Sequence, residues 1–149
     1  MADQVTFGGF VPYVPYEDAD AALDWLHDTF GFEERARYVD KDGVVQQAEM
    51  RVGDAELWVS GLRPGDDASR HAGTWIGVWV DDVDAMYERV RAAGIDADEP
   101  VDKDYDVRTF SVQDPAGYSW GFMKRLGTSY VQKIPTAEGG LEEVLPAAR

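Results

Sequence analysis

Apolar and polar residues alternate most regularly near the end of the chain, in residues 111–123. After the turn sequence DPAG at 114–117, Tyr118, Trp120 and Phe122 alternate with small or polar residues. Residues two apart share a face of a strand, and proline followed by glycine suits a tight turn. The pattern predicts a strand, a turn and a second strand, with one aromatic face for the core and one face of little bulk.

Two other stretches show apolar residues at the spacing of a helix face. The first helix is expected to start at Asp18 or Asp20 as N-cap and to run to Phe30, with Gly31 as its stop. The second is expected to start at Asp81 or Asp82 and to end at Gly94. The apolar stripes consist of Ala22, Trp25, Leu26, Thr29 and Phe30, and of Val83, Met86, Tyr87, Val90 and Ala93.

The remaining apolar runs predict strands. Residues 7–16 are extended, but Pro12 and Pro15 remove ladder donors, so this strand should be short, bulged or at an edge. A hairpin turn at 41–43 separates two of the other strands, and an acidic loop at 102–106 separates another pair. These strands are expected at 32–39, 44–51, 55–60, 74–80, 95–101 and 107–113.

The two halves of the chain repeat one order of elements. The helix stops Gly31 and Gly94 are 63 positions apart, and the turn glycines Gly53 and Gly117 are 64 positions apart. This period predicts two βαβββ modules, neither large enough to fold alone. We expect one domain over residues 1–125, with modules at about 7–60 and 74–125, a turn-rich linker at 61–73 and a mostly irregular tail at 126–149.

Composition narrows the classes of function. The 149 residues are 44% hydrophobic and include no cysteine, which excludes disulfides, zinc–thiolate sites and thiol nucleophiles. The net charge of −15 disfavours nucleic acid and would attract cationic small molecules, although solubility alone also explains it. No leader pattern or apolar run of membrane length is present, so we expect a soluble cytoplasmic protein that binds neither membranes nor nucleic acid.

Three motifs in order resemble the vicinal oxygen chelate superfamily, which includes glyoxalase I, bleomycin-resistance proteins and extradiol dioxygenases. They are DADAALDW at 18–25 with FGFE at 30–33, VDDVDA at 80–85 with AAG at 92–94, and DPAG at 114–117 with WGF at 120–122. With DVRTF at 106–110, they resemble its glyoxalase-like, bleomycin-resistance-like branch. The resemblance implies an α+β fold in which two βαβββ modules form a curled mixed sheet with a concave pocket, helices outside, usually as a homodimer.

The same resemblance locates the metal-ligand positions of the family. Metal-using members place a His or Glu on each of four strands, and the matching positions here are Val11, Glu56, Trp75 and Gly121. Only Glu56 could coordinate a metal, and one carboxylate does not hold a divalent ion against water. The two histidines, His27 and His71, fall on the first helix and in the linker. We therefore expect no metal and no other cofactor, and neither glyoxalase nor dioxygenase chemistry.

If these four positions face the pocket, strand alternation adds further lining residues. They are Tyr13, Trp58, Ser60, Gly77, Trp79, Ser119 and Met123. Aromatic walls with one carboxylate suit a flat or cationic ligand, although tryptophans on strands also serve packing or a dimer interface. Two roles are open for Glu56: it acts as a general base, or it forms an ion pair with Arg37 or Arg108. Two roles are also open for Arg108: it binds a carboxylate of the ligand, or it is an exposed or structurally paired residue.

Three classes of function follow. The first is a non-catalytic protein that sequesters a cationic or aromatic antibiotic or metabolite in an aromatic-lined pocket. The second is a lyase or isomerase acting on a small oxygenated substrate, with Glu56 as base or sole retained metal ligand. The third is a structural or regulatory dimer with a vestigial pocket.

Overall fold

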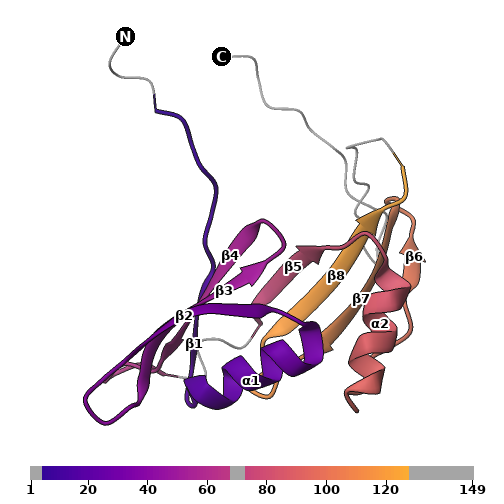
Figure 1. The fold of residues 1–149 in the computed structure, drawn as a ribbon. Coiled ribbons are helices and arrows are strands. Elements are labelled where there is room, and N and C mark those ends of the chain that lie inside the picture. The colour runs from indigo at the N-terminus through magenta and orange to yellow at the C-terminus, as the bar shows by residue number, and fades with distance from the viewer. Residues whose placement is uncertain (1–4, 68–72, 128–149) are drawn as a thin grey trace. The chain divides into compact units, whose positions relative to one another are not determined.

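The structure, a computed structural model, describes residues 5–67 and 73–127. The chain divides into two compact units, Met1–His71 and Ala72–Arg149. The first contains β1 (Tyr13–Tyr16), α1 (Ala19–Phe30), β2 (Glu33–Val39), β3 (Val45–Val52) and β4 (Ala55–Gly61). The second contains β5 (Trp75–Trp79), α2 (Val83–Ala92), β6 (Val101–Lys103), β7 (Val107–Gln113) and β8 (Ser119–Arg125) (Figure 1).

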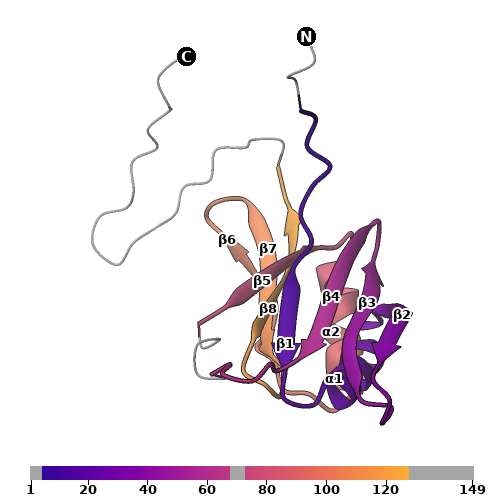
Figure 2. The same cartoon turned by 90° about the vertical axis from the view of Figure 1, so that its left-hand side faces the viewer.

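Both units have the same strand order. In the first, the sheet runs β1-β4-β3-β2, and in the second it runs β5-β8-β7-β6 (Figure 2). The outer pairs β1–β4 and β5–β8 are parallel, and the other neighbours are antiparallel. The prediction of a repeated βαβββ module in an α+β fold is thus confirmed, with one mixed sheet in each module.

The first strand is short and lies at a sheet edge, as its prolines require. β1 covers only four residues, and the backbone carbonyl of Pro12 still accepts a hydrogen bond from the Trp58 N–H at 2.9 Å. Residues 5–12 continue away from the sheet as an extended segment (Figure 1). A proline in a central strand would remove a ladder donor, whereas an edge strand can leave that position unpaired.

Each helix covers one face of its own sheet. Leu23 and Leu26 of α1 are buried together with Val14 and Val59 of the adjacent strands. In the second unit, Val83 and Val90 of α2 are buried, as are Phe110, Trp120 and Phe122. Tyr118, Trp120 and Phe122 therefore form the aromatic core face that the alternation predicted.

The structure shows which of the two candidate aspartates is the N-cap of each helix. The carboxylate of Asp18 accepts the Ala21 N–H at 3.0 Å, and that of Asp82 accepts the Ala85 N–H at 2.9 Å. Asp20 and Asp81 are not the caps. Gly31 ends α1 in the left-handed region with φ of 82°, where glycine carries no Cβ penalty.

One predicted strand is wrong. We expected a strand over 95–101, but 95–100 is irregular and β6 covers only Val101–Lys103. Pro100 has no N–H to donate to a ladder, and the Asp96 carboxylate bonds Arg91 of α2 at 2.8 Å instead. The segment therefore stays beside the helix until Val101 joins β7.

Within the described ranges, no helix is both long enough and apolar enough to cross a membrane.

Candidate functional site

Each sheet leaves the face opposite its helix for other contacts. We name these faces after one residue on each, the Glu56 face in the first unit and the Trp75 face in the second. Strand pairing places Tyr13, Glu56, Trp58 and Ser60 on the Glu56 face. On the Trp75 face it places Trp75, Gly77, Trp79, Ser119, Gly121 and Met123. Each face therefore gathers the residues that alternation had grouped within its own module.

The carboxylate of Glu56 lies in a polar network. Its Oε1 is 3.5 Å from Nη1 of Arg35, which also bonds Glu49 Oε2 at 2.6 Å. Its Oε2 accepts a hydrogen bond from the Trp58 indole N–H at 3.3 Å. Trp58 in turn meets Tyr13 edge to face, with ring centroids 5.9 Å apart. The Glu56 face thus combines two aromatic rings with a carboxylate that is already ion-paired.

The partner of Glu56 differs from the two arginines considered in the sequence. Arg37 lies on the helix side of the sheet, where it binds Glu34 and Asp20 and lowers the pKa of the Glu34 carboxyl. Arg35 reaches Glu56 instead because the β2–β3 register shifts between Glu34 and Ala36, and such a shift re-aims a side chain.

On the Trp75 face, the Trp75 indole lies across two glycines. A Cβ on Gly121 would lie 2.3 Å from Trp75 Cζ2, and one on Gly77 would lie 2.7 Å from Trp75 Cη2. These separations are far below van der Waals contact, so only glycine lets the ring lie flat along the sheet. Trp75 is still 52% exposed. The result is an aromatic platform that is fixed on one side and accessible to solvent.

Trp79 and Met123 continue this face toward the end of β8. They are register partners, and the guanidinium carbon of Arg125 lies 4.1 Å from the centroid of the Trp79 ring, in a cation–π contact. Arg125 was not among the predicted site residues. The alternation that placed Met123 on this face extends two residues further to Arg125, so the signal was present in the sequence.

Arg108 lies on the opposite side of the same sheet. It bonds both Asp84 carboxylate oxygens of α2, at 2.7 and 3.0 Å, and Asp102 of β6 at 2.8 Å. Hydrogen bonding to Arg108 lowers the pKa of Asp84. Of the two roles considered for Arg108, the geometry provides the structural pairing, and it does not bring the guanidinium beside Trp75.

The family's metal-ligand positions hold a different arrangement. The Trp75 indole occupies the space into which a side chain at position 121 would point. Across residues 5–67 and 73–127, no three His, Cys, Asp or Glu side chains are grouped so that they could hold a metal ion. His27 bonds the Phe32 carbonyl at 2.9 Å beside the end of α1, and His71 lies outside the described residues. The residues present do not fit the family's metal.

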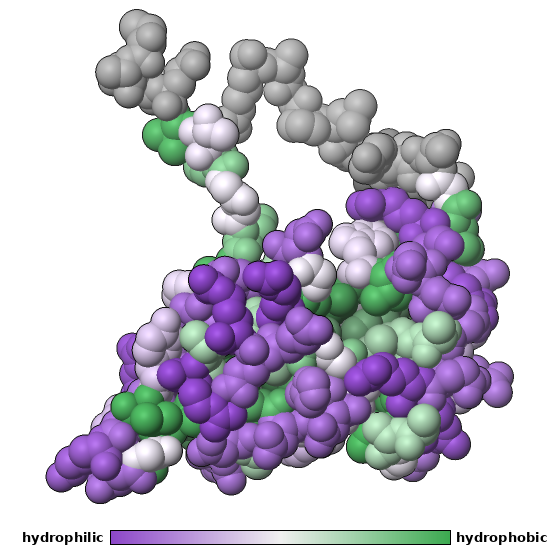
Figure 3. Space-filling view, in the orientation of Figure 1, coloured by the Kyte–Doolittle hydropathy of each residue, from purple (hydrophilic) through white to green (hydrophobic). Residues whose placement is uncertain are grey.

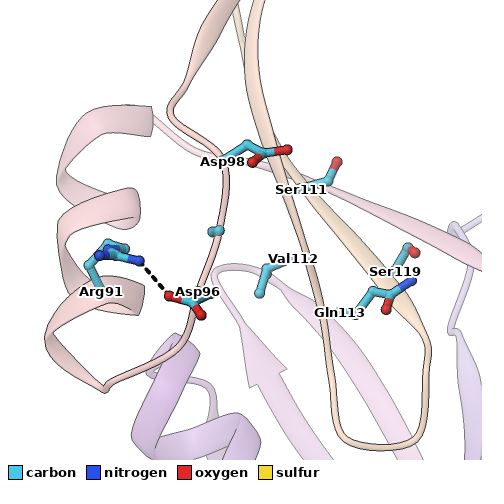
Figure 4. Close-up of a pocket in the computed structure, with 8 residues that line it drawn as sticks. Arg91, Asp96, Asp98, Ser111, Val112, Gln113 and Ser119 are labelled. Atoms are coloured by element: carbon cyan, nitrogen blue, oxygen red, sulfur yellow. Dashed lines mark hydrogen bonds and ion pairs between the residues drawn. The ribbon is translucent and has the colours of Figure 1, made fainter.

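A polar hollow of about 580 Å³ adjoins the Trp75 face at the edge of β7 (Figure 4). Ser111, Gln113 and Ser119 contribute from the strands, and Asp98 lies above Ser111. Asp96 is on the helix side of the hollow, paired with Arg91. Of these residues, Ser119 alone was predicted for the site. The hollow exists because the strand expected over 95–101 does not form before Val101.

The chain is similar in sequence and structure to proteins of one family. Residues 5–122 match the model of the Glyoxalase/Bleomycin resistance protein/Dioxygenase superfamily. None of the curated protein sequences compared with the chain is significantly similar to it.

Several solved structures share the fold. TioX from Micromonospora sp. ML1 is 31% identical, with a TM-score of 0.69 over 80% of this chain and 100% of that one. The bleomycin-binding protein of bleomycin-producing Streptomyces verticillus, solved with copper(II)-bleomycin, is 27% identical, with a TM-score of 0.62 over 80% and 97%. The lactoylglutathione lyase of Agrobacterium tumefaciens is 20% identical, with a TM-score of 0.63 over 80% and 95%, a likeness of fold alone. The chain therefore belongs to the glyoxalase/bleomycin resistance protein/dioxygenase superfamily.

Proposed function

We propose that this protein binds a planar aromatic small molecule without transforming it, by stacking the molecule on Trp75. The observation that carries the proposal is the Trp75 indole held flat over Gly77 and Gly121 while half of its surface is exposed. The bleomycin-binding relative supports binding as the class of function.

The Trp75 platform favours binding because the conformational entropy of this side chain is lost when the protein folds and not when the ligand binds. Offset stacking of two aromatic rings contributes about 0.5 to 1.5 kcal/mol beyond the area that it buries. A side chain that is already in its bound position loses little further conformational freedom when the ligand arrives. Gly77 and Gly121 provide that order, since any larger residue there would displace the ring.

The enzymatic alternative has less support. A lyase or isomerase would use Glu56 as its base or as its one metal ligand, but this carboxylate is paired with Arg35 and bonded by the Trp58 indole. A general base must reach a substrate proton, and Glu56 would first have to leave these partners. We propose that the protein works without a metal or other cofactor.

We also propose that the protein is a homodimer. Phe7 and Phe10, in the extended segment before β1, are 91% and 99% exposed. This segment carries apolar residues outside the body of its unit, which is covered mostly by hydrophilic side chains in the same view (Figure 3). Two fully exposed phenylalanines near each other are typical of a surface that is buried in an assembly.

The test of the binding proposal is a titration with metal-free bleomycin, copper(II)-bleomycin and a panel of neutral bicyclic aromatics. Intrinsic fluorescence and the indole N–H signals of the five tryptophans report binding. We expect Trp75→Ala to weaken binding about tenfold or more, as loss of an aromatic anchor that the ligand covers does. Gly121→Val should do the same by displacing the indole.

The matched control is Trp25→Phe, because Trp25 lies on α1 against Phe30 and touches neither open face. Equal affinity of the wild type and Trp75→Ala for every compound would overturn the proposal. Recovery of a chemically altered ligand, abolished by Glu56→Gln, would establish the enzymatic alternative instead.

A further inference from the structure

The polar hollow beside the Trp75 face offers hydrogen-bonding groups to a ligand. Ser111, Gln113 and Ser119 line it from β7 and β8. Within residues 5–67 and 73–127, the side chains of these three residues form no hydrogen bond. Serine hydroxyls and the glutamine amide can each donate and accept. The hollow therefore suits a group that also does both.

The edge of β7 that borders the hollow has no strand beside it in the described part of the chain. The Asp114 N–H donates to the Tyr118 carbonyl, just before β8, at 3.0 Å. Backbone groups of an antiparallel strand point alternately to its two sides, so those of Ser111 and Gln113 point away from β8. β6 pairs only with residues 107–109, and among the described residues no backbone hydrogen bond joins 95–100 to this edge. Two N–H and two C=O groups are thus open toward the hollow.

An anionic group is disfavoured in the hollow. Asp98 lies above Ser111 (Figure 4) and forms no ion pair within the described residues. Asp96 is paired with Arg91 at 2.8 Å, and Glu99, next to Asp98 in the sequence, is exposed. The carboxylates at this hollow therefore outnumber its one guanidinium, and a second carboxylate would be repelled.

The hollow lies within reach of a ring stacked on Trp75. Strand pairing sets Ser111 beside Gly121, which lies under the indole, and neighbouring strands are about 4.8 Å apart. A chain added at the β7 edge would lie two such spacings, about 10 Å, from the strand under the ring. Because an extended residue spans about 3.5 Å, a bicyclic ring with a spacer of one residue reaches this edge.

The opposite end of the platform is closed by Met123. A Cβ on Gly77 would lie 2.7 Å both from Trp75 Cη2 and from the Met123 methyl carbon, so the methyl group borders the end of the indole. The indole nitrogen lies on the other side, 2.8 Å from the position of a Cβ on Gly121. A ligand substituent therefore has room on the β7 side of the ring.

We infer that the ligand of this protein is an aromatic amide, with its ring stacked on Trp75 and an uncharged secondary amide bound at the β7 edge by Ser111 and Gln113. The inference rests on the proposed stacking function and names the ligand class for it. A secondary amide carries one donor and one acceptor, as each residue at a sheet edge does. An ammonium has three donors and no acceptor, so it would leave the open N–H groups of this edge without a partner.

The test compares four probes with one ring system and one linker. They are the N-methylamide, the methyl ester and the free acid of 2-naphthoylglycine, and N-(2-aminoethyl)-2-naphthamide, which ends in an ammonium. Affinities are measured on the full chain by the shifts of the indole N–H signals. We expect the methylamide to bind about fivefold more tightly than the ester, which lacks one donor, and more tightly than the ammonium. The acid should bind most weakly, because its carboxylate approaches Asp98.

Amide hydrogen exchange locates the bound group. With free methylamide at ten times its dissociation constant, exchange of the Ser111 and Gln113 N–H groups should slow about tenfold. The Val112 N–H is the internal control, because it points to β8 and is bonded without ligand. Unchanged exchange at Ser111 and Gln113 while the probe is bound would overturn the inference.

Asp98→Asn should raise the affinity for the free acid about twofold to fivefold and leave that for the methylamide nearly unchanged. The matched control is Asp104→Asn, which makes the same charge change in the turn between β6 and β7, outside the lining of the hollow. Thermal melts of both variants check that the fold is intact. Equal gains in the two variants would contradict the placement of the end group in the hollow.

The outcomes separate the two proposals. Equal binding of methylamide and ester, both lost in Trp75→Ala, would overturn the aromatic amide and leave the stacking function standing. Tighter binding of the ammonium or of the acid would likewise overturn it. Binding of none of the four probes would overturn the aromatic amide, and if bleomycin bound in a Trp75-dependent way, the stacking function would survive.

Discussion

Asp114 is the residue on which the turn between β7 and β8 depends. Its side chain is 5% exposed and accepts hydrogen bonds from the backbone N–H groups of Ala116 and Tyr118 and from the Trp120 indole, at 3.0 to 3.1 Å. One carboxylate thus accepts hydrogen bonds from three donors, two of them buried, in the turn that leads into β8.

We expect Asp114→Ala to lower the free energy of unfolding by about 3 kcal/mol or more, since each buried donor left without an acceptor costs about 1 to 3 kcal/mol. Urea unfolding measures the change. Asp40→Ala is the control, because Asp40 accepts two backbone N–H bonds in the exposed hairpin turn and should cost less than about 1 kcal/mol. Equal losses in the two variants would contradict the assigned role of Asp114.

Tyr118 makes the folding stability of the protein depend on pH in the alkaline range. Burial, aided by the charge of Asp114, raises the pKa of Tyr118 from 10.0 to about 12. A raised folded-state pKa contributes stability that is complete below pH 10 and is lost as the pH rises from 10 to 12.

Stability should therefore fall across this window more steeply in the wild type than in Tyr118→Phe. Urea unfolding at pH 9, 10.5 and 11.5 measures the slope, and the difference between the two tyrosinate absorbance titrations locates the pKa. Parallel pH profiles for the two proteins would show that Tyr118 titrates normally.

At the scale of elements, the start of α2 shows which of two adjacent aspartates acts as the N-cap. Asp81 and Asp82 are chemically identical, yet only the Asp82 carboxylate reaches the Ala85 N–H, because it occupies the cap position three residues earlier.

We expect Asp82→Ala to destabilise the protein by about 1 kcal/mol and Asp81→Ala to have little effect, since only the former leaves a helix donor unpaired. Chemical denaturation measures both. A larger effect at Asp81 would mean that the helix begins one residue earlier.

At the scale of the whole molecule, the proposed homodimer makes a direct prediction. Sedimentation equilibrium at micromolar concentration should give twice the chain mass of 16.6 kDa. Replacing Phe7 and Phe10 by serine should shift the equilibrium toward monomer, because about 1.5 to 3 kcal/mol is gained for each large apolar side chain buried. Exchange of the exposed Tyr38 for serine is the control, since Tyr38 lies on edge strand β2 and outside this segment. A monomer at every concentration would contradict the proposal.

The sequence by itself determined the features that depend on neighbours along the chain. Alternation in 118–123 and proline in 7–16 predicted which faces are buried and which strand lies at an edge, because strand periodicity and a missing N–H act locally. The repeat and the three motifs predicted the α+β modules and the family. The strand over 95–101 was predicted incorrectly, because Pro100 has no N–H for a ladder and Asp96 pairs with Arg91 of α2, a contact that depends on the tertiary structure.

Only the tertiary structure decided what the open faces contain. Trp75 and Gly121 are 46 positions apart, and nothing local shows that the indole of one occupies the Cβ space of the other. Likewise, Arg35 rather than Arg37 reaches Glu56 because of a register shift between two strands.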